Sequence, residues 1–193
     1  MPIANESISS YLDALSSRKS TPGGGAAAAF SGAQAASLMS MVLELSDDFP
    51  GHKTRSDLIT EIKLAVQRFT QLADEDTEAF SSLMQAFRNK GDIQAGLKAA
   101  ATPPLACLSL VVQLTQQLDT VKQYGNANLI TDTAIAALLL RDTILASELN
   151  VLINLRSIED DKFKQSARTT IHSAKAQIEY LESVATEISQ QLS

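Results

Sequence analysis

The chain between residues 55 and 89 reads RSDLITEIKLAVQRFTQLADEDTEAFSSLMQAFRN. Apolar side chains recur in it at three- and four-residue spacing, the period of a helix that buries one face. The positions that share this face are Ile59, Ile62, Val66, Phe69, Ala73, position 76, Phe80, Leu83 and Phe87. The pattern predicts one long helix whose apolar face is the seam of a helix bundle. Position 76 is the exception, because it holds an aspartate.

The segment before this helix is rich in small residues. Residues 20–25 read STPGGG, the strongest helix breaker in the chain, and a helix is expected to follow from about residue 26 to residue 46. Its first half is almost entirely Ala, Ser and Gly. Small side chains let another backbone approach closely, so we expect this helix to be central and tightly packed.

The rest of the chain also predicts helices, at residues 7–17, 92–101, 102–124, 132–155 and 160–193. The boundary at Thr102 rests on the two prolines that follow it, since threonine is a common cap and proline is tolerated in the first turn. No segment alternates as a strand does. We therefore expect one all-α domain over residues 1–193, an antiparallel bundle of long helices whose apolar faces also suit a homodimer.

Composition and charge exclude several classes of protein. The 193 residues, 45% of them hydrophobic, can bury a core without a disulfide or a metal. The net charge of −6 argues against a nucleic-acid binder, because neutralising phosphates needs clustered Lys and Arg. We see no uninterrupted apolar run of membrane-spanning length and no signal-peptide pattern, so we expect no membrane partner and a cytoplasmic location. The lone cysteine, Cys107, lies in an apolar run and is interpreted as a buried thiol.

Asp76 is the first candidate site residue. An ionised carboxylate in a dry seam is costly unless it is paired or hydrogen-bonded. Either the seam opens there into a polar cavity, or Asp76 forms an ordinary ion pair or reaches the surface. The residues alone leave these alternatives open.

Asp132 is the second candidate. A carboxylate at the start of a helix usually caps it or complements its dipole. The helical face that Asp132 begins is small and polar, and its other members are Ala136, Thr143, Ser147, Asn150 and Asn154. A polar strip on an otherwise apolar helix indicates a wet cavity or a polar seam. Its two asparagines could bind an amide-bearing heterocycle, or they could bridge neighbouring helices.

The loop Pro22-Gly23-Gly24-Gly25 admits three interpretations. It is a simple joint, a place where a substrate approaches bare backbone, or a set of free amides that binds an anion at a helix N-terminus. It is not a P-loop, since no Gly-Lys-Ser/Thr follows. His52 and His172 lie far apart without metal-ligand spacing, so we expect no metal site.

Three segments together resemble the cyclodeaminase/cyclohydrolase family, which includes the cyclodeaminase part of formiminotransferase-cyclodeaminase and stand-alone methenyltetrahydrofolate cyclohydrolases. STPGGGAAA at residues 20–28 is similar to the family's Pro-Gly-Gly-Gly start of an alanine-rich helix. DTEAF at 76–80 is similar to its Asp-x-x-Ala-Phe. The most specific match is YGNANLITD at 124–132, followed at the expected separation by NVLIN at 150–154. The resemblance covers nearly the whole chain in order.

This resemblance implies an all-helical homodimer with its site near the subunit interface, and no metal or cofactor beyond a folate substrate. Asp132 matches the aspartate regarded as catalytic in the family, where it transfers a proton at the one-carbon nitrogen group of the folate. The residues that would bind or shape the pterin pocket are Pro22, Gly23, Gly24, Gly25, Asp76, Asn126, Asn150 and Asn154.

The activity implied first is conversion of 5-formiminotetrahydrofolate to 5,10-methenyltetrahydrofolate and ammonia. The alternatives are a methenyltetrahydrofolate cyclohydrolase and a catalytically silent helical bundle that binds folate or a protein, or that only forms a dimer. The chain departs from the family pattern at Ala26 and Thr131, where the family often has serine, and it keeps Asp132.

Overall fold

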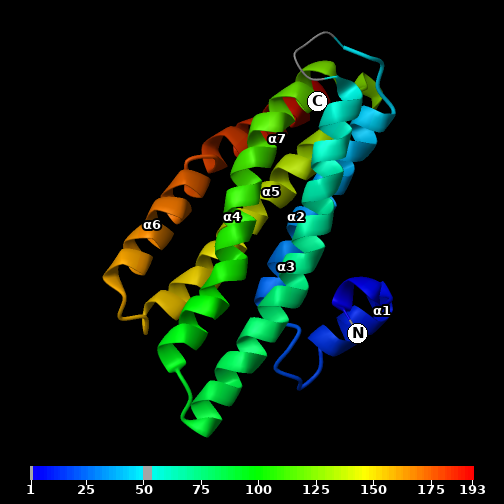
Figure 1. The fold of residues 1–193 in the computed structure, drawn as a ribbon. Helices are drawn as coiled ribbons and strands as arrows, with labels where there is room; N and C mark the ends of the chain where they lie inside the picture. Colours follow the sequence, from blue (N-terminus) through cyan, green and yellow to red (C-terminus); the bar gives the residue numbers. More distant parts are fainter. Residues whose placement is uncertain (1, 50–53) are drawn as a thin grey trace.

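The computed structural model describes residues 2–49 and 54–193, and all regular structure within these ranges is helical. The elements, in chain order, are η1 (Ile3–Asn5), α1 (Ile8–Leu15), α2 (Gly24–Glu44), α3 (Arg55–Asn89), α4 (Ile93–Tyr124), η2 (Ala127–Leu129), α5 (Ile130–Leu155), α6 (Asp161–Lys175) and α7 (Ile178–Gln191). In Figure 1 the helices α2 to α5 run side by side as an antiparallel bundle, with α6 and α7 on one side of it and α1 on the other. The prediction of an all-α bundle of long helices is confirmed.

Helix α2 lies at the centre, in contact with α3, α4 and α5. Its alanines at positions 26, 29, 33 and 36 are buried. A Cβ on Gly32 would fall within 3.0 Å of the Phe69 ring on α3, so only glycine lets these two helices approach so closely. The expectation of a central, tightly packed helix is confirmed.

Helix α3 carries the seam that its periodicity predicts. It begins with a capping box in which Thr54 and Asp57 bond each other's backbone amides, and it ends at Lys90 in the left-handed conformation, with φ of 54°. Ile62 and Phe69 in the seam are fully buried, whereas Phe87 in the last turn is half exposed. The seam therefore holds over most of the helix and opens at its C-terminal end.

Helix α4 is continuous where the sequence predicts a break. Pro103 and Pro104 lie inside it and are buried, and Thr102 does not cap a new helix. Its hydroxyl donates instead to the Lys98 carbonyl, 2.9 Å away in the preceding turn. The predicted boundary at residue 102 is wrong, because packing of the apolar segment against neighbouring helices outweighs the local preference of proline.

The C-terminal segment is divided where the sequence predicts one helix. Helix α6 ends at Lys175 and α7 begins at Ile178, with backbone hydrogen bonds of the short three-residue type between them. Ala174 and Leu181, on either side of this turn, are both buried in the core. No glycine or proline marks the turn, so the sequence lacks a local signal for it.

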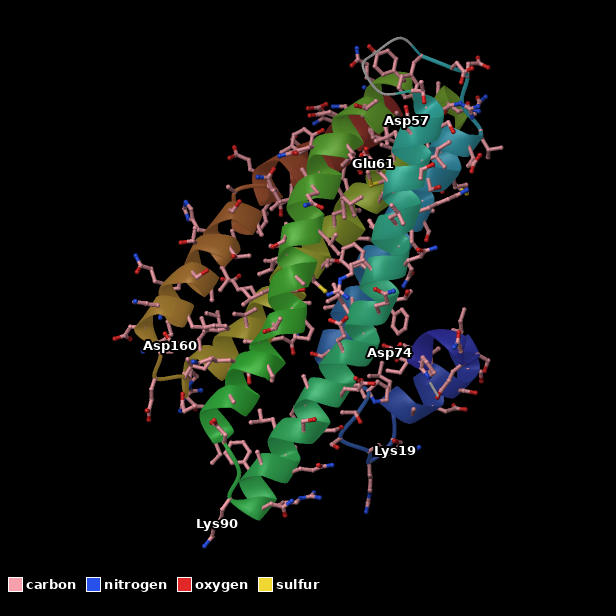
Figure 2. The ribbon with its side chains drawn as sticks, viewed as in Figure 1. Lys19, Asp57, Glu61, Asp74, Lys90 and Asp160 are labelled. Atoms are coloured by element: carbon pink, nitrogen blue, oxygen red, sulfur yellow. The ribbon has the colours of Figure 1, made fainter. Side chains whose placement is uncertain are left out.

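The N-terminal segment attaches to the bundle at two points. Asp74 on α3 accepts a hydrogen bond from the Ile3 backbone amide at 2.6 Å, and Figure 2 labels this aspartate beside α1. Tyr11 on α1 meets Phe30 on α2 edge-on, with ring centroids 4.9 Å apart. These contacts place α1 beside the loop that starts α2.

By length and composition alone, α2 and α4 are each apolar enough to cross a membrane. In α2, 61% of the most apolar stretch is buried inside the bundle, and in α4 the buried share is 44%. Burial in a protein core is a common reason for such composition.

Candidate functional site

The glycine loop reaches the bundle at the first turn of α2. Gly23 is the N-cap and offers no side chain to the free amides of that turn. The Thr21–Pro22 peptide before it is cis. Thr21 and Pro22 line a cavity of about 550 Å³ between the loop and α1, and Thr77 of α3 also lines it. The Thr77 hydroxyl oxygen is buried and has no hydrogen-bond partner among the described residues.

Asp76 of α3 approaches the loop at Gly25. A Cβ built on Gly25 would fall within 3.0 Å of all three atoms of the Asp76 carboxyl group, so a side chain at position 25 and this carboxylate exclude each other. The Ala26 backbone amide donates a hydrogen bond to the carboxylate. Asp76 therefore supplies from another helix the N-terminal acceptor that Gly23 lacks.

Burial raises the pKa of Asp76 to about 6, and the Ala26 hydrogen bond only partly offsets that rise. Asp76 forms no ion pair within residues 2–49 and 54–193. The nearby guanidinium of Arg68 bonds Glu75 through both of its terminal nitrogens. An ion pair is therefore excluded for Asp76 within the described residues. Asp76 is instead a partly buried carboxylate on α3 that faces the N-terminus of α2.

Asn150 of α5 lies on the other side of the same loop. A Cβ on Gly24 would be 3.8 Å from both amide atoms of its side chain, an ordinary van der Waals distance. The Asn150 amide nitrogen donates to the Ala146 carbonyl at 2.9 Å, and that of Asn154 donates to the Asn150 carbonyl at 2.9 Å. Asn150 and Asn154 therefore bond their own helix and do not bridge to another.

A layer of buried polar side chains lies behind the loop. The polar strip of α5 faces the interior at Thr143 and Ser147, which are fully buried. The Ser147 hydroxyl lies beside the Cys107 thiol of α4 but forms no well-oriented hydrogen bond. Burial, followed by the Asp76 charge, raises the pKa of Cys107 to about 12, so the thiol stays protonated as its apolar surroundings predict.

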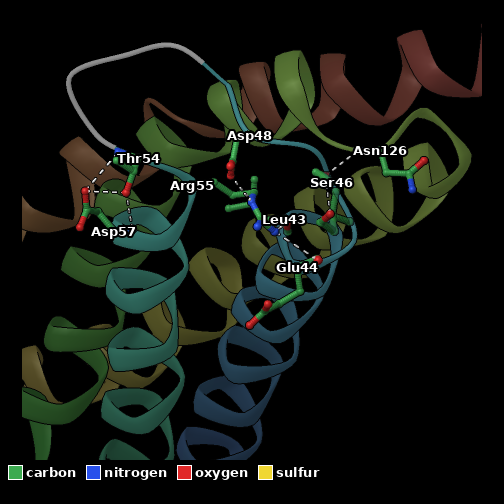
Figure 3. Close-up of polar contacts among 9 residues, drawn as sticks. Leu43, Glu44, Ser46, Asp48, Thr54, Arg55, Asp57 and Asn126 are labelled. Carbon is green, nitrogen blue, oxygen red and sulfur yellow. Dashed lines mark hydrogen bonds and ion pairs between the residues drawn. The ribbon is translucent and has the colours of Figure 1, made fainter.

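Asn126 lies at the opposite end of the bundle, in the turn between α4 and α5. Its backbone amide donates to the Ser46 hydroxyl at 2.8 Å, and its side-chain nitrogen donates to the Leu45 carbonyl at 2.9 Å. Its side-chain oxygen accepts from the Asn128 amide at 3.0 Å. Figure 3 shows this turn held against the C-terminal end of α2. Both ends of the Asn126 side-chain amide are engaged within the protein.

Asp132 follows in the first turn of α5. It is partly buried, and it forms no hydrogen bond or ion pair with its side chain in the described part of the chain. The N-cap of α5 is Leu129, which provides no side-chain acceptor. A carboxylate at this position complements the helix dipole and remains free to accept a ligand donor.

The sequence-predicted residues therefore form two groups. The loop cluster contains Pro22 to Gly25, Asp76, Asn150 and Asn154, and the turn cluster contains Asn126 and Asp132. Eighteen residues of α5 separate Asp132 from Asn150, which is five helical turns and about 27 Å, so both project from the same side of the helix. One copy of the chain does not bring Asp132 to the glycine loop.

Sequence reasoning did not identify Thr77 or the pairing of Gly25 with Asp76. The only sequence feature that pointed to this region was Asp76 itself, an aspartate among the apolar seam positions of α3. Among the described residues, no group of three or more His, Cys, Asp or Glu side chains could hold a metal ion. His52 lies outside the described residues.

Comparison with known proteins relates this geometry to one family. The sequence model of the formiminotransferase-cyclodeaminase family matches residues 7–173. The methenyltetrahydrofolate cyclohydrolase of Methylorubrum extorquens is 32% identical over 179 residues, covering 83% of this chain and 85% of that protein. The formimidoyltransferase-cyclodeaminase of Rattus norvegicus is 30% identical over 188 residues, which are 89% of this chain but only 34% of that longer protein.

A solved structure shares the whole fold. The crystal structure of formiminotetrahydrofolate cyclodeaminase from Thermotoga maritima superposes with a TM-score of 0.84 at 30% sequence identity. The superposition covers 98% of each chain. The bundle is therefore similar over its full length to a protein of known structure.

Proposed function

The chain belongs to the formiminotransferase-cyclodeaminase family, and we propose that it converts 5-formiminotetrahydrofolate to 5,10-methenyltetrahydrofolate with release of ammonia. The observation that carries this choice is the similarity to a stand-alone formiminotetrahydrofolate cyclodeaminase over the full length of both chains. We expect the reaction to take place in the cytoplasm and to need no cofactor besides the folate.

The reaction needs a group that moves protons between nitrogen atoms. N10 attacks the formimino carbon and forms the new C–N bond, while its proton passes to Asp132. The former imino nitrogen then leaves as ammonia, taking a proton back from Asp132 as the C–N bond to it breaks. The methenyl product is a cation, so one proton from solvent completes the ammonia. The Asp132 carboxylate, which has no fixed partner in the described part of the chain, suits both transfers.

The cyclohydrolase reaction is the second candidate. It is favoured by the 32% identity with a cyclohydrolase of similar length. In that reaction water adds to the methenyl carbon and Asp132 takes a proton from the water. The bond from that carbon to N5 then breaks, N5 takes up the proton held by Asp132, and the hydroxyl group loses its proton to solvent to leave a formyl group on N10. The same carboxylate serves both reactions, which is why Asp132 does not distinguish them.

The distance between the two clusters supports a site shared by two copies of the chain. The outer face of α5 carries an apolar stripe that is interrupted at Arg141 and Asp142. Its members are exposed by 36% to 68% and are Ile135, Leu138, Leu149, Leu152 and Ile153. Unpaired apolar stripes of this kind are typical of interaction surfaces. We therefore propose that a second copy of the chain covers the stripe.

A two-fold axis near Arg141, halfway between Asp132 and Asn150, would pair the two α5 helices antiparallel. The partner subunit's Asp132 would then lie level with the loop cluster of the first copy. Arg141, at the centre of the stripe, bonds Asp142 at 2.9 Å and Glu182 of α7 at 2.7 Å, so its positive charge is offset there. Each dimer would hold two identical sites, each built from both subunits.

The substrate assay tests the proposed function. The protein is incubated separately with 5-formiminotetrahydrofolate and with 5,10-methenyltetrahydrofolate, and the methenyl absorbance and released ammonia are followed. Appearance of methenyl absorbance together with ammonia establishes the cyclodeaminase. Loss of methenyl absorbance above the buffer rate establishes the cyclohydrolase instead. If neither signal changes, the chain is not an enzyme of either kind.

A further inference from the structure

The side chains of the loop cluster offer hydrogen-bond acceptors to a ligand, although the N-terminus of a helix usually offers backbone N–H donors. The Ala146 carbonyl accepts from Asn150, so the atom of Asn150 that faces it must be the amide nitrogen. This orientation leaves the Asn150 side-chain oxygen as the free end. The Asp76 carboxylate has four acceptor positions, of which the Ala26 amide uses one. Both groups lie against the consecutive residues Gly24 and Gly25.

The exposed glycine beside these acceptors leaves its backbone bare. Gly24 is exposed, whereas Gly25 is buried under the Asp76 carboxylate. No side chain rises from Gly24, so a flat ring can lie against the peptide plane there.

The first turn of α2 is at the same time poorly suited to an anion. Asp76 already accepts from the Ala26 amide, and its negative charge stands at the positive end of the helix dipole. A second carboxylate placed there would meet like charge. Among the three interpretations of the glycine loop, an anion-binding site is therefore disfavoured. The favoured interpretation is that a ligand rich in hydrogen-bond donors approaches the loop backbone closely.

We propose that Asp76 and Asn150 together recognise the amino-pyrimidinone edge of the pterin ring, with the Asp76 carboxylate accepting from the ring N–H and from the exocyclic amino group. This inference rests on the proposed function, and it names the part of the folate that the loop cluster holds. An adjacent N–H and NH₂ match the fork of a carboxylate, and the Asn150 oxygen can accept the remaining amino hydrogen.

Burial and charge support the same assignment. A partly buried carboxylate without a cation is costly, and the raised pKa of Asp76 reflects that cost. Within the described residues no charged group shifts the pKa of Asp76, although its own charge helps to raise the pKa of Cys107 on α4. The α2 residues that meet it, Gly25 and Ala26, are neutral. Two hydrogen-bond donors on the ligand would stabilise the ionised form of Asp76. The ligand would thus provide the compensation for burial that no cation of the described residues provides.

The test compares two pteridines that differ at one position. Pterin carries the 2-amino group, whereas lumazine carries a carbonyl oxygen there and would place an acceptor against the carboxylate. Their dissociation constants are measured by calorimetric titration for the wild type, for Asp76→Asn and for Glu78→Gln. Glu78 is an exposed carboxylate two residues along α3, so its variant controls for the loss of one charge.

We expect the wild type and Glu78→Gln to prefer pterin over lumazine by about 10- to 100-fold, the range for a charge-assisted hydrogen bond. Asp76→Asn keeps an acceptor for Ala26 but turns a donor toward the ligand, and its preference should fall to about twofold or less. Far-UV circular dichroism confirms that each variant is folded.

Equal preference in the wild type and Asp76→Asn overturns the assignment, as does a wild type that does not discriminate between the two pteridines. Either result leaves the proposed function standing if the substrate assay shows turnover. Retained pterin discrimination together with no turnover would instead reject the enzyme and keep the pterin site.

Discussion

The carboxylate of Asp76 fills the space that a side chain on Gly25 would need. These residues lie on different helices, and neither alone signals the contact. The pairing explains why the chain keeps a glycine inside the first turn of α2, where alanine would form helix more readily. It also explains how an aspartate is accommodated in the seam of α3.

Replacing Gly25 with alanine should destabilise the protein, because the new methyl group meets the Asp76 carboxylate. Overpacking of this kind costs about 1–3 kcal/mol. In the double variant Gly25→Ala/Asp76→Ala the clash is gone, so the double variant should be more stable than the sum of the single effects predicts. Urea unfolding measures all four species. Additive effects would mean that the two residues do not interact.

Asp76→Asn should stabilise the protein at neutral pH. The folded-state pKa of Asp76, about 6, lies above the ordinary value of 3.8, so the stability that its protonation contributes is present below pH 3.8 and is lost as pH rises through 6. Asparagine does not ionise and avoids that loss. We expect a gain of about 1–2 kcal/mol near pH 7.5, reduced for the partial exposure of the group, and little difference near pH 4. A destabilised variant at neutral pH would identify the carboxylate as a structural cap.

Asp132→Asn should lower kcat about 10²- to 10⁴-fold while leaving the helical content unchanged. The carboxylate is the proposed proton carrier, and among residues 2–49 and 54–193 it forms no hydrogen bond or ion pair that the variant would remove. Methenyl absorbance measures the rate. The matched control is Asp161→Asn, which removes an exposed aspartate from the first turn of α6. Near-wild-type turnover in Asp132→Asn would rule out the proposed role.

Gly24→Val should weaken folate binding, and Gly24→Ala should have little effect. A Cβ at position 24 stays 3.8 Å from the Asn150 amide, but the two methyl groups of valine reach further over the bare peptide. We expect the dissociation constant for 5-formyltetrahydrofolate to rise about tenfold or more in Gly24→Val and less than about threefold in Gly24→Ala. Equal affinities for both variants would remove the loop from the binding site.

Co-expression of Gly24→Val and Asp132→Asn chains tests the shared site. Half of the dimers in an equal mixture contain one chain of each kind, and each of these has one intact site if the site takes its loop from one subunit and Asp132 from the other. At substrate concentrations well below the dissociation constant of Gly24→Val, about one quarter of the wild-type activity should then return, more than the average of the two variants alone. Sites contained within single subunits predict no recovery.

The class of the fold, the positions of most helices and the motifs shared with the family could be predicted from the sequence. The seam of α3 and the small residues of α2 were readable because helical periodicity and side-chain size are local properties. The break at Thr102 was wrong, and the turn after Lys175 was missed, because tertiary packing outweighs weak local preferences.

The tertiary structure alone decided which candidates meet. It brought Gly25 to Asp76 and Gly24 to Asn150, although these pairs lie 51 and 126 positions apart in the chain. It also placed the glycine loop beside the Asn150 end of α5, and so left Asp132 at the other end of the bundle. The physical reason is that the direction of each helix and its neighbours depend on how all the apolar faces of the chain are buried together. The sequence of one segment does not show how the other segments pack against it.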